Sequence, residues 1–413
     1  MAVEHAAAPV TTRRSATRGP EFIAILAGLM ALNALAIDIM LPAFPEIAAD
    51  LALSDANHAQ FVILSYVVGF GGAQLFFGPV SDRFGRRAPL FAGLALYILS
   101  AAAGALAPSF ELLIAARVLQ GIGAAATRTI ALSVVRDTHS GRDMAAIMSL
   151  VMVVFMVVPV FAPLAGQVIV LFGEWHLVFL SMAVFGGAML LWTALRLPET
   201  LPEARRRPLT MASVIGAFRI VVSNRTSLFY ALATAFFFSS LYAFLNSAQQ
   251  IYVDIYGLGP LFPVAFASVA MLMAVSSFLN SRLVRRVGQR RLSHTALLLY
   301  AVLSTALAVI AWLMPVPFWL FLGMFCLIMP LFGWVGANLN SIAMEPLGAV
   351  AGTGASVLGF TQTVGGGIVG ALIGQAFDGT IFPLVTGFAG VSVIALGLIL
   401  IAEKGRLFGV GPA

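Results

Sequence analysis

Three charged residues, Asp38, Arg117 and Arg128, lie within long apolar stretches of the sequence. If those stretches cross a lipid bilayer, a bare charge at the bilayer centre costs about 2.5–3.5 kcal/mol, so such groups face a wet cavity or pair with one another. Asp38 is an acid that can titrate there, three residues before Leu41-Pro42. We expect it to exchange a proton with water. The alternative is an interfacial residue that caps a helix near the outer surface.

The two arginines require partners or a wet surface. Asp38 lies at a depth compatible with Arg117 and is its expected partner, although Arg117 could also be a permanent clamp between two helices. Arg117, Gly121, Ala124 and Arg128 are spaced by 4, 3 and 4 residues and so share one helical face. If Arg128 faces a cavity, two positive charges and one titratable acid would disfavour dications and favour neutral, zwitterionic or anionic molecules. Otherwise Arg128 snorkels to the inner surface.

A compact charged segment joins the second and third apolar stretches. Its glycines permit a tight turn and close helix approach. Its acid can face a helix N-terminus, and its arginines can pair with a loop acid such as Asp137. Contacts of this kind would have to break in a conformational change, which suggests a gate. The alternative is a plain basic loop. The residues concerned are Gly78, Asp82, Arg83, Gly85, Arg86 and Arg87.

Aromatic and amide side chains form a stripe along the seventh apolar stretch. Phe238, Tyr242, Asn246 and Gln249 are spaced by 4, 4 and 3 residues, so they share one face of a helix. The two amide side chains would cost energy if that face met lipid. We expect this face to meet a cavity, whereas the alternative is helix–helix packing with interhelical hydrogen bonds. The predicted cavity residues are Arg128, Tyr66, Phe238, Tyr242, Asn246, Gln249, Trp334 and Asn338.

The composition requires lipid as the solvent for these stretches. Hydrophobic residues make up 61% and charged residues 10% of the 413 residues, with a mean hydropathy of +1.00. Soluble domains have about 45–50% and 25%, respectively. A soluble enzyme, a nucleic-acid-binding protein and a disordered chain are therefore excluded. The net charge of +6 reflects 23 basic against 17 acidic residues and is explained by their positions.

Apolar runs of about 20 residues, the length that spans a bilayer as a helix, recur along the chain. We predict an all-α membrane protein with twelve spans in two pseudo-symmetric six-helix bundles, at 22–196 and 227–402. A polar linker at 197–226 joins the bundles, and tails at 1–21 and 403–413 flank them. The predicted spans are 22–42, 59–79, 88–107, 110–134, 144–169, 176–196, 227–250, 260–281, 293–314, 317–338, 353–376 and 382–402.

The distribution of basic residues orients the spans. With the N-terminus inside, 21 of the 23 Lys and Arg residues fall in cytoplasmic segments and none falls in an external loop. This asymmetry satisfies the positive-inside rule and places both termini in the cytoplasm. The segment 339–352 is assigned to the inside although it has no basic residue. The first apolar stretch is too long for a cleaved signal peptide, so we expect a retained span.

The two halves share an internal repeat. Gly85-Arg86-Arg87 is followed by Tyr97, and Gly288-Gln289-Arg290-Arg291 is followed by Tyr300, in each case twelve residues after the glycine. The offset of 203 is close to half the chain. Both pieces lie between the second and third span of a half. Two similar halves predict a transporter with a central site between them.

Enzymatic, metal and cofactor chemistry find no support in the sequence. The five histidines show no metal-ligand spacing, and the lone Cys326 rules out an internal disulfide and a cysteine-based cluster. A phosphate-binding G-x-x-x-x-G-K-S/T loop is absent. We expect no enzyme activity, no metal and no cofactor, and the small residues at 365–367 are expected to let helices approach closely.

The segment 78–87 resembles the loop 2–3 signature of the major facilitator superfamily, G-x-x-x-D-R-x-G-R-R/K. The run Arg117-Val-Leu-Gln120-Gly121-Ile-Gly123 is similar to the family's span-4 proton-coupling motif, which implies a coupling role for Arg117. Pro159, Pro163 and Gly166 resemble its proline-glycine antiporter motif, although the first glycine is missing and a second proline is present. This departure weakens the inference of antiport.

Further stretches look like one branch of that family, the Bcr/CflA-type drug exporters. They are Asp38 through Pro45, Arg136-Asp137, Glu345-Pro346, Ala351-Gly352-Thr353, Gln362 and Asp378-Gly379. The resemblance implies export of drug-like small molecules in exchange for protons at a bacterial inner membrane, with no nucleic-acid partner, and the fold can work as a monomer. The rivals are a proton-coupled importer of a small metabolite and a receptor or scaffold that does not transport. A receptor would explain neither the intramembrane charges nor the repeated loop.

Overall fold

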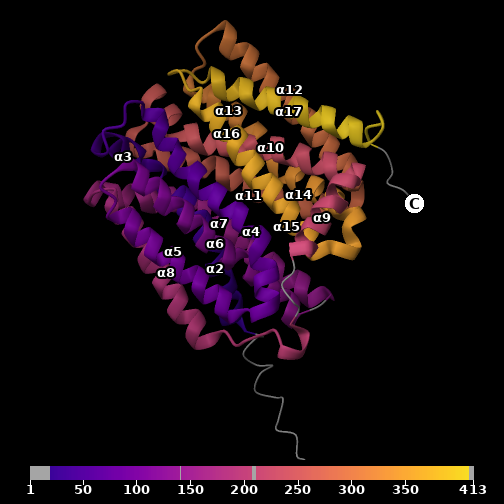
Figure 1. Cartoon of the computed structure of the whole chain (residues 1–413). Helices are drawn as coiled ribbons and strands as arrows, with labels where there is room; N and C mark the ends of the chain where they lie inside the picture. Colours follow the sequence, from indigo (N-terminus) through magenta and orange to yellow (C-terminus); the bar gives the residue numbers. More distant parts are fainter. Residues whose placement is uncertain (1–18, 140, 207–210, 409–413) are drawn as a thin grey trace, which may run out of the picture.

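The computed structural model describes residues 19–139, 141–206 and 211–408, and these residues form helices, turns and loops without a strand (Figure 1). Most of the predicted N-terminal tail, with Arg13, Arg14 and Arg18, lies outside the described residues, as do Arg207 and residues 409–413. The predicted all-helical class is confirmed. It follows from apolar runs of bilayer length, in which each backbone N–H and C=O bonds within its own segment.

Eleven helical segments of the described chain are long and apolar enough to cross a membrane. A further helix, α7 (Gly141–Phe172), contributes the shorter apolar stretch Val157–Phe172. The helices that build the eleven segments are α2 (Pro20–Asp38) with α3 (Phe44–Asp50), α4 (Phe61–Phe84), α5 (Arg87–Ala105), α6 (Phe110–Thr138), α8 (His176–Arg196), α10 (Arg225–Gln249), α11 (Phe262–Val287), α12 (Gln289–Leu313), α13 (Phe318–Ile328) with α14 (Leu331–Met344), α15 (Ala351–Phe360) with α16 (Gly366–Gln375), and α17 (Phe382–Ala402).

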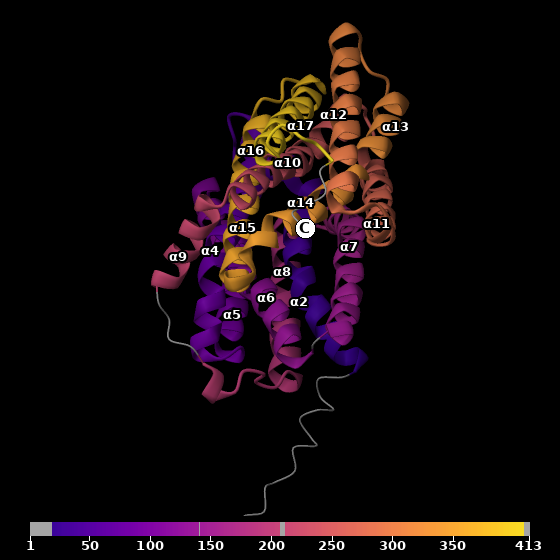
Figure 2. The same cartoon turned by 90° about the vertical axis from the view of Figure 1, so that its right-hand side faces the viewer.

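The helices pack in two groups along the chain (Figures 1 and 2). In the first group α6 lies between α4 and α5, α5 contacts α8, and α2 contacts α6, α7 and α8. In the second group α10 lies against α14, α16 and α17, and α12 contacts α14 and α17. The groups meet where α7 packs on α11 and where α4 packs on α15 and α16. Figure 2 shows α7 beside α11 at one of these contacts.

Small residues set the closest contacts within the first group. A Cβ built on Gly69 of α4 would collide with the carbonyl oxygen of Val118, and one built on Gly121 of α6 would collide with that of Tyr66. The backbones of α4 and α6 therefore lie closer together than any larger residue would allow. This packing positions Arg117 and Arg128 on the face of α6 that α4 covers.

Several helices are interrupted. Pro330 separates α13 from α14, because a proline inside a helix removes a backbone donor. Two π-helical turns continue α10 and α15: Gln250–Ile255 follows α10, and Thr361–Gly365 separates α15 from α16. Such turns are frequent at functional sites because they rotate side chains out of the regular helical pattern. The segment after α8 carries a 13-residue helix, α9 (Met211–Ser223), which packs against α10 and α15.

Candidate functional site

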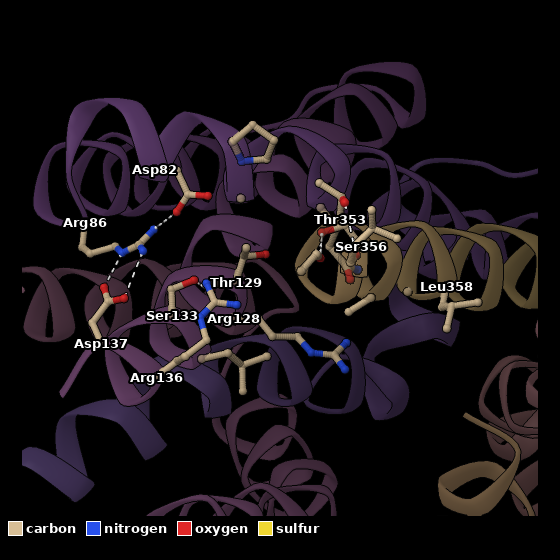
Figure 3. A pocket seen from close by; sticks show the side chains of 18 of the residues that line it. Asp82, Arg86, Arg128, Thr129, Ser133, Arg136, Asp137, Thr353, Ser356 and Leu358 are labelled. Carbon is tan, nitrogen blue, oxygen red and sulfur yellow. Dashed lines mark hydrogen bonds and ion pairs between the residues drawn. The ribbon is translucent and has the colours of Figure 1, made fainter. Parts of the chain in front are cut away.

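A cavity of about 1390 Å³ lies between the two groups of helices (Figure 3). Residues of α4, α6, α7, α14, α15 and the segment after α8 line it. It is at the end of the molecule where Arg86 and Arg290 lie, which we call the arginine end. Of the residues predicted from the sequence, the lining includes Gly78, Asp82, Arg86, Asp137 and Arg128.

Hydrogen-bonded amides join the two groups at the opposite end, the amide end. Gln60 Nε2 donates to Gln250 Oε1 at 2.8 Å, and Gln250 Nε2 donates to Asn57 Oδ1 at 2.6 Å. Gln375 Nε2 donates to the carbonyl oxygen of Asn57 at 2.6 Å. Asn57, Gln60, Gln250 and Gln375 form what we call the amide cluster. Because these bonds run between the groups, they hold this end closed while the cavity lies toward the other.

Arg86 organises the loop between α4 and α5. Its guanidinium is 2.7 Å from Asp82 and 2.7 Å from Asp137, so it bridges the end of α4 to the end of α6. Figure 3 shows Arg86 between these two acids, with Thr353 and Ser356 of α15 across the cavity. Burial lowers the pKa of Arg86, but the hydrogen bonds to Asp137 and Asp82 raise it above its usual value overall. The predicted pairing of this loop with Asp137 is thus seen at Arg86.

The neighbouring arginines make different contacts. Arg87 donates to the carbonyl oxygen of Ala194, and Arg83 lies over the ring of Phe84. Neither has an ion pair with an acid among the described residues.

Glu199, which the sequence did not single out, supplies the acid at the N-terminus of α5. Its carboxylate accepts the backbone N–H groups of Arg86 at 2.9 Å and Arg87 at 3.0 Å. Burial raises the pKa of Glu199, but these bonds lower it below its usual value overall. The sequence predicted that Asp82 faces a helix N-terminus. In the described chain the acid at α5 is Glu199 instead, because Asp82 is held by Arg86.

The repeat brings the same geometry to the second group. Gly85 and Gly288 have φ of 86° and 87°, a conformation that favours glycine. Arg290 binds Glu345 and Glu403, each at 2.8 Å, as Arg86 binds two acids in the first group. The sequence assigned no role to these two acids. Glu345 lies in the segment 339–352, which has no basic residue. Its ion pair with Arg290 explains why an acid is present in that segment.

Asp38 is the last residue of α2 and is only 4% exposed. Among the described residues it has no hydrogen bond or ion pair. A Cβ built on Gly166 of α7 would collide with the carbonyl oxygen of Ile39, the next residue after Asp38. Pro163 and Gly166 are buried and Pro159 is half-buried on α7. The predicted antiporter motif therefore packs against the end of the helix that carries Asp38.

Arg117 does not pair with Asp38, which corrects the predicted partnership. Its fully buried guanidinium donates to the carbonyl oxygens of Val62 at 3.1 Å and Ala36 at 3.0 Å, and to Gln120 Oε1 at 2.6 Å. α2 ends at Asp38, so the carbonyl of Ala36 has no partner further along its own helix and is free to accept the arginine. The alternative considered for Arg117, a clamp between helices, describes this structure.

Tyr66 is also part of this clamp rather than of the cavity lining. Its ring lies 4.4 Å below the Arg117 guanidinium, and its hydroxyl donates to Asn33 Oδ1 at 3.0 Å. The side chain is fully buried. Tyr66 therefore connects α4 to α2 through Asn33.

The stripe on α10 packs against glycines of α16 and does not line this cavity. A Cβ on Gly370 would lie 2.5 Å from the Cβ of Tyr242, and one on Gly374 would lie 2.9 Å from that of Asn246. Phe238 faces Gly366 and packs edge-on against Phe332. Three glycines of α16, each four residues apart, thus pack against three members of the stripe. Gln249, the fourth member, is buried outside the cavity lining.

Trp334 and Asn338 also hold helices together. Trp334 Nε1 donates to the carbonyl oxygen of Ser276 at 2.8 Å, and Asn338 Nδ2 donates to Asn280 Oδ1 at 2.9 Å. Both bonds join α14 to α11. Among the predicted cavity residues, only Arg128 lines the cavity described here, where its guanidinium lies 5.8 Å from the centre of the Phe70 ring.

These features define a class of protein: an all-helical multi-pass membrane transporter, with two groups of helices around a cavity that is reached from one end. The sequence matches the Major Facilitator Superfamily over residues 26–371. The chain belongs to this family, so it is a transporter rather than an enzyme.

Two bacterial relatives cover nearly the whole chain. The MFS-type transporter YdgK of Bacillus subtilis (strain 168) is 34% identical over 356 residues, covering 85% of this chain and 88% of that protein. The bicyclomycin resistance protein homolog of Haemophilus influenzae is 30% identical over 378 residues, covering 91% and 94%. The multidrug resistance protein MdtL of Escherichia coli O45:K1 is 34% identical over 230 residues, covering 55% and 57%.

Solved structures share the fold. A peptide transporter POT in complex with alafosfalin has a TM-score of 0.76 at 16% identity, covering 98% of this chain and 100% of that one. The xylose transporter XylE from E. coli, in a partially occluded inward-open conformation, has a TM-score of 0.73 at 13% identity, covering 95% and 98%.

Proposed function

We propose that this protein exports drug-like small molecules from the cytoplasm in exchange for protons. The observation that carries the proposal is the position of Asp38. It is a buried acid without a basic partner in the described chain, at the end of α2, and the proline-glycine element of α7 packs directly against the next residue. The names of the relatives, bicyclomycin resistance and multidrug resistance, favour export over import.

The proposed topology has twelve spans, with α7 as the fifth. The 32-residue length of α7 and its apolar stretch support this assignment. The bundles comprise residues 22–196 and 227–402, joined by a cytoplasmic linker at 197–226. The excess of basic residues supports a cytoplasmic location for the arginine end and both termini. The bacterial relatives support an inner membrane location, and we propose that the monomer is the working unit.

In this orientation the structure corresponds to an inward-open state. The cavity faces the cytoplasm and the amide cluster closes the outer end. Opening of the amide cluster would admit water to the outer half of α2, where Asp38 takes up a proton. Return to the inward-open state would release the proton and let a new substrate enter. The arginine-end networks around Arg86 and Arg290 are the proposed inner gate, which rearranges in each cycle.

Everted membrane vesicles test the exchange. Vesicles energised to a proton gradient receive a panel of diverse antibiotics, and the gradient is followed with wild-type protein and with Asp38→Asn. We expect at least one compound to dissipate the gradient with wild type only. Asp254→Asn is the matched control, because this acid is exposed in the π-helical turn that follows α10. Equal activity of Asp38→Asn and wild type on an active compound would refute the coupling role. Uptake of a nutrient without any antibiotic response would favour import.

A further inference from the structure

The inward-facing cavity contains a buried amide that no protein group satisfies. Gln74 of α4 is 7% exposed, and its Nε2 has no hydrogen-bond partner among the described residues. A buried donor left unpaired destabilises a protein, which is a reason to look for a ligand there. Gln74 lines the cavity and lies against Gly359 of α15.

A second amide lines the same cavity. Gln362 is one turn beyond Gly359, within the π-helical turn Thr361–Gly365, and also lines the cavity. Asn340 Nδ2 donates to Gln362 Oε1 at 2.7 Å. This bond leaves the Nε2 group of Gln362 free to donate. The π-helical turn thus supplies a second N–H donor to the cavity lining, one turn beyond the glycine that Gln74 contacts.

Arg128 reaches the same cavity from α6. It lies over Phe70, which is one turn before Gln74 on α4. Gln74 is ten residues from the end of α4 at Phe84, and Arg128 is ten residues from the end of α6 at Thr138. Each is therefore about 15 Å from the arginine end at 1.5 Å per residue. Gln74 and Arg128 therefore share one depth of the cavity, and Gln362 follows one turn beyond the glycine that Gln74 contacts.

The charge balance of the lining points to a negative ligand. Its two acids, Asp82 and Asp137, are both bound by Arg86 at the mouth. Arg128 has no carboxylate partner in the described part of the chain, nor has Arg136 at the mouth. A cation in the cavity would meet positive charge without a free acid to bind it, whereas a carboxylate would meet donors that lack acceptors.

We propose that Arg128, Gln74 and Gln362 form a binding subsite for the carboxylate of a small amphipathic substrate, either an anion or a zwitterion. This inference rests on the proposed transport function and specifies its substrate class. Arg128 supplies the charge and a fork of two parallel N–H donors. The two amides supply neutral donors that fix the orientation of the carboxylate.

A matched pair of fluorescent probes, dansylglycine and dansylglycinamide, tests the proposal with the purified full-length protein in nanodiscs. They differ in a carboxylate against a carboxamide, and binding is read by energy transfer from the intrinsic tryptophans. We expect the acid to bind at least tenfold more tightly than the amide. Arg128→Gln should bring the two Kd values within twofold, and Gln74→Glu should abolish the preference for the acid. Arg285→Gln, an exposed arginine outside the cavity lining, is the control and should retain it.

Arg128→Lys keeps the charge without the fork and provides a second variant if Arg128→Gln does not fold. It should reduce the preference without removing it. The proposal is overturned if wild type binds the acid no more tightly than the amide, or if Arg128→Gln keeps a tenfold preference. Binding is measured without a proton gradient, so failure here is distinguishable from failure of the transport function. A neutral antibiotic that dissipates the gradient in vesicles would leave the proposed function standing.

Discussion

Removal of one amide from the amide cluster should shift the protein toward an outward-open state. Gln60 donates to Gln250 Oε1 at 2.8 Å and to the carbonyl oxygen of Gly374 at 3.2 Å. Both partners belong to the second group of helices. A net contribution of about 0.5–1.5 kcal/mol per hydrogen bond means that Gln60→Ala destabilises the closed outer end by about 1–3 kcal/mol. Because 1.4 kcal/mol is a factor of ten, the ratio of outward-open to inward-open molecules should rise by about 5- to 150-fold.

Spin labels across the outer end measure this ratio. Ser54 and Ala376 are exposed, and they lie on the two sides of the amide cluster. With Cys326→Ser as background, double electron–electron resonance between labels at these positions should show a larger long-distance population in Gln60→Ala. Gln289→Ala is the matched control, because no described residue hydrogen-bonds the side chain of Gln289. An unchanged distance distribution in Gln60→Ala would refute the proposal that the amide cluster holds the outer end closed.

Three further predictions concern packing, pH and membrane potential. Gly370→Ala should destabilise the protein by about 1–3 kcal/mol, because the new Cβ meets Tyr242 and the backbone of α10, and thermal melts should show it. Gly397→Ala, where a Cβ meets nothing within 4 Å, should not. The pKa of Glu199 is lowered in the folded state, so its contribution to stability is present above its unfolded pKa near 4.5 and is lost as pH falls through its folded pKa. Glu199→Gln should therefore lower the melting temperature at pH 7 and have little effect in strong acid; an equal loss at both pH values would contradict this linkage. When one proton enters and one monoanion leaves, two elementary charges cross the membrane in each cycle. A membrane potential of 100 mV should therefore contribute about 4.6 kcal/mol to the driving force for export, against about 2.3 kcal/mol for a neutral substrate. Valinomycin-imposed potentials in proteoliposomes should stimulate export of dansylglycine more than that of dansylglycinamide, and equal stimulation would contradict monoanion exchange.

Hydropathy predicted the helices well where a span is bounded by clear polar residues. The predicted spans 176–196 and 382–402 coincide with α8 (His176–Arg196) and α17 (Phe382–Ala402). The span predicted at 317–338 is instead two helices, separated at Pro330, and α14 continues to Met344. An apolar pattern indicates which residues contact lipid, but it does not show how far a helix extends beyond the membrane.

The partners of polar residues were harder to predict, because they depend on helices that are distant in the sequence. Arg117 finds the carbonyl of Ala36, which is free only because α2 ends two residues later. The sequence does not show which backbone carbonyl is left without a partner inside its own helix. The role of Glu199 was missed for the same reason, since its partners precede it by more than 100 residues.

The stripe on α10 shows a limit of helical periodicity. Its spacing correctly placed Phe238, Tyr242 and Asn246 on one face, but a shared face does not reveal whether it meets water or another helix. The glycines at 366, 370 and 374 were the available signal, because their interval of four matches that of the stripe. Gln74 lacked any such pattern and was identified only from its unsatisfied nitrogen.

The polar networks at the two ends of the molecule differ in chemistry. At the open arginine end ion pairs form within each group of helices, whereas at the closed amide end neutral groups bond across the two groups. Ion pairs are screened by salt, whereas amides carry no charge and do not titrate over the physiological range. In the proposed orientation the amide end faces the medium outside the cell, whose salinity and acidity the cell does not control, and the ion pairs face the buffered cytoplasm. A cell that moves between fresh and saline surroundings would therefore keep the outer closure equally strong.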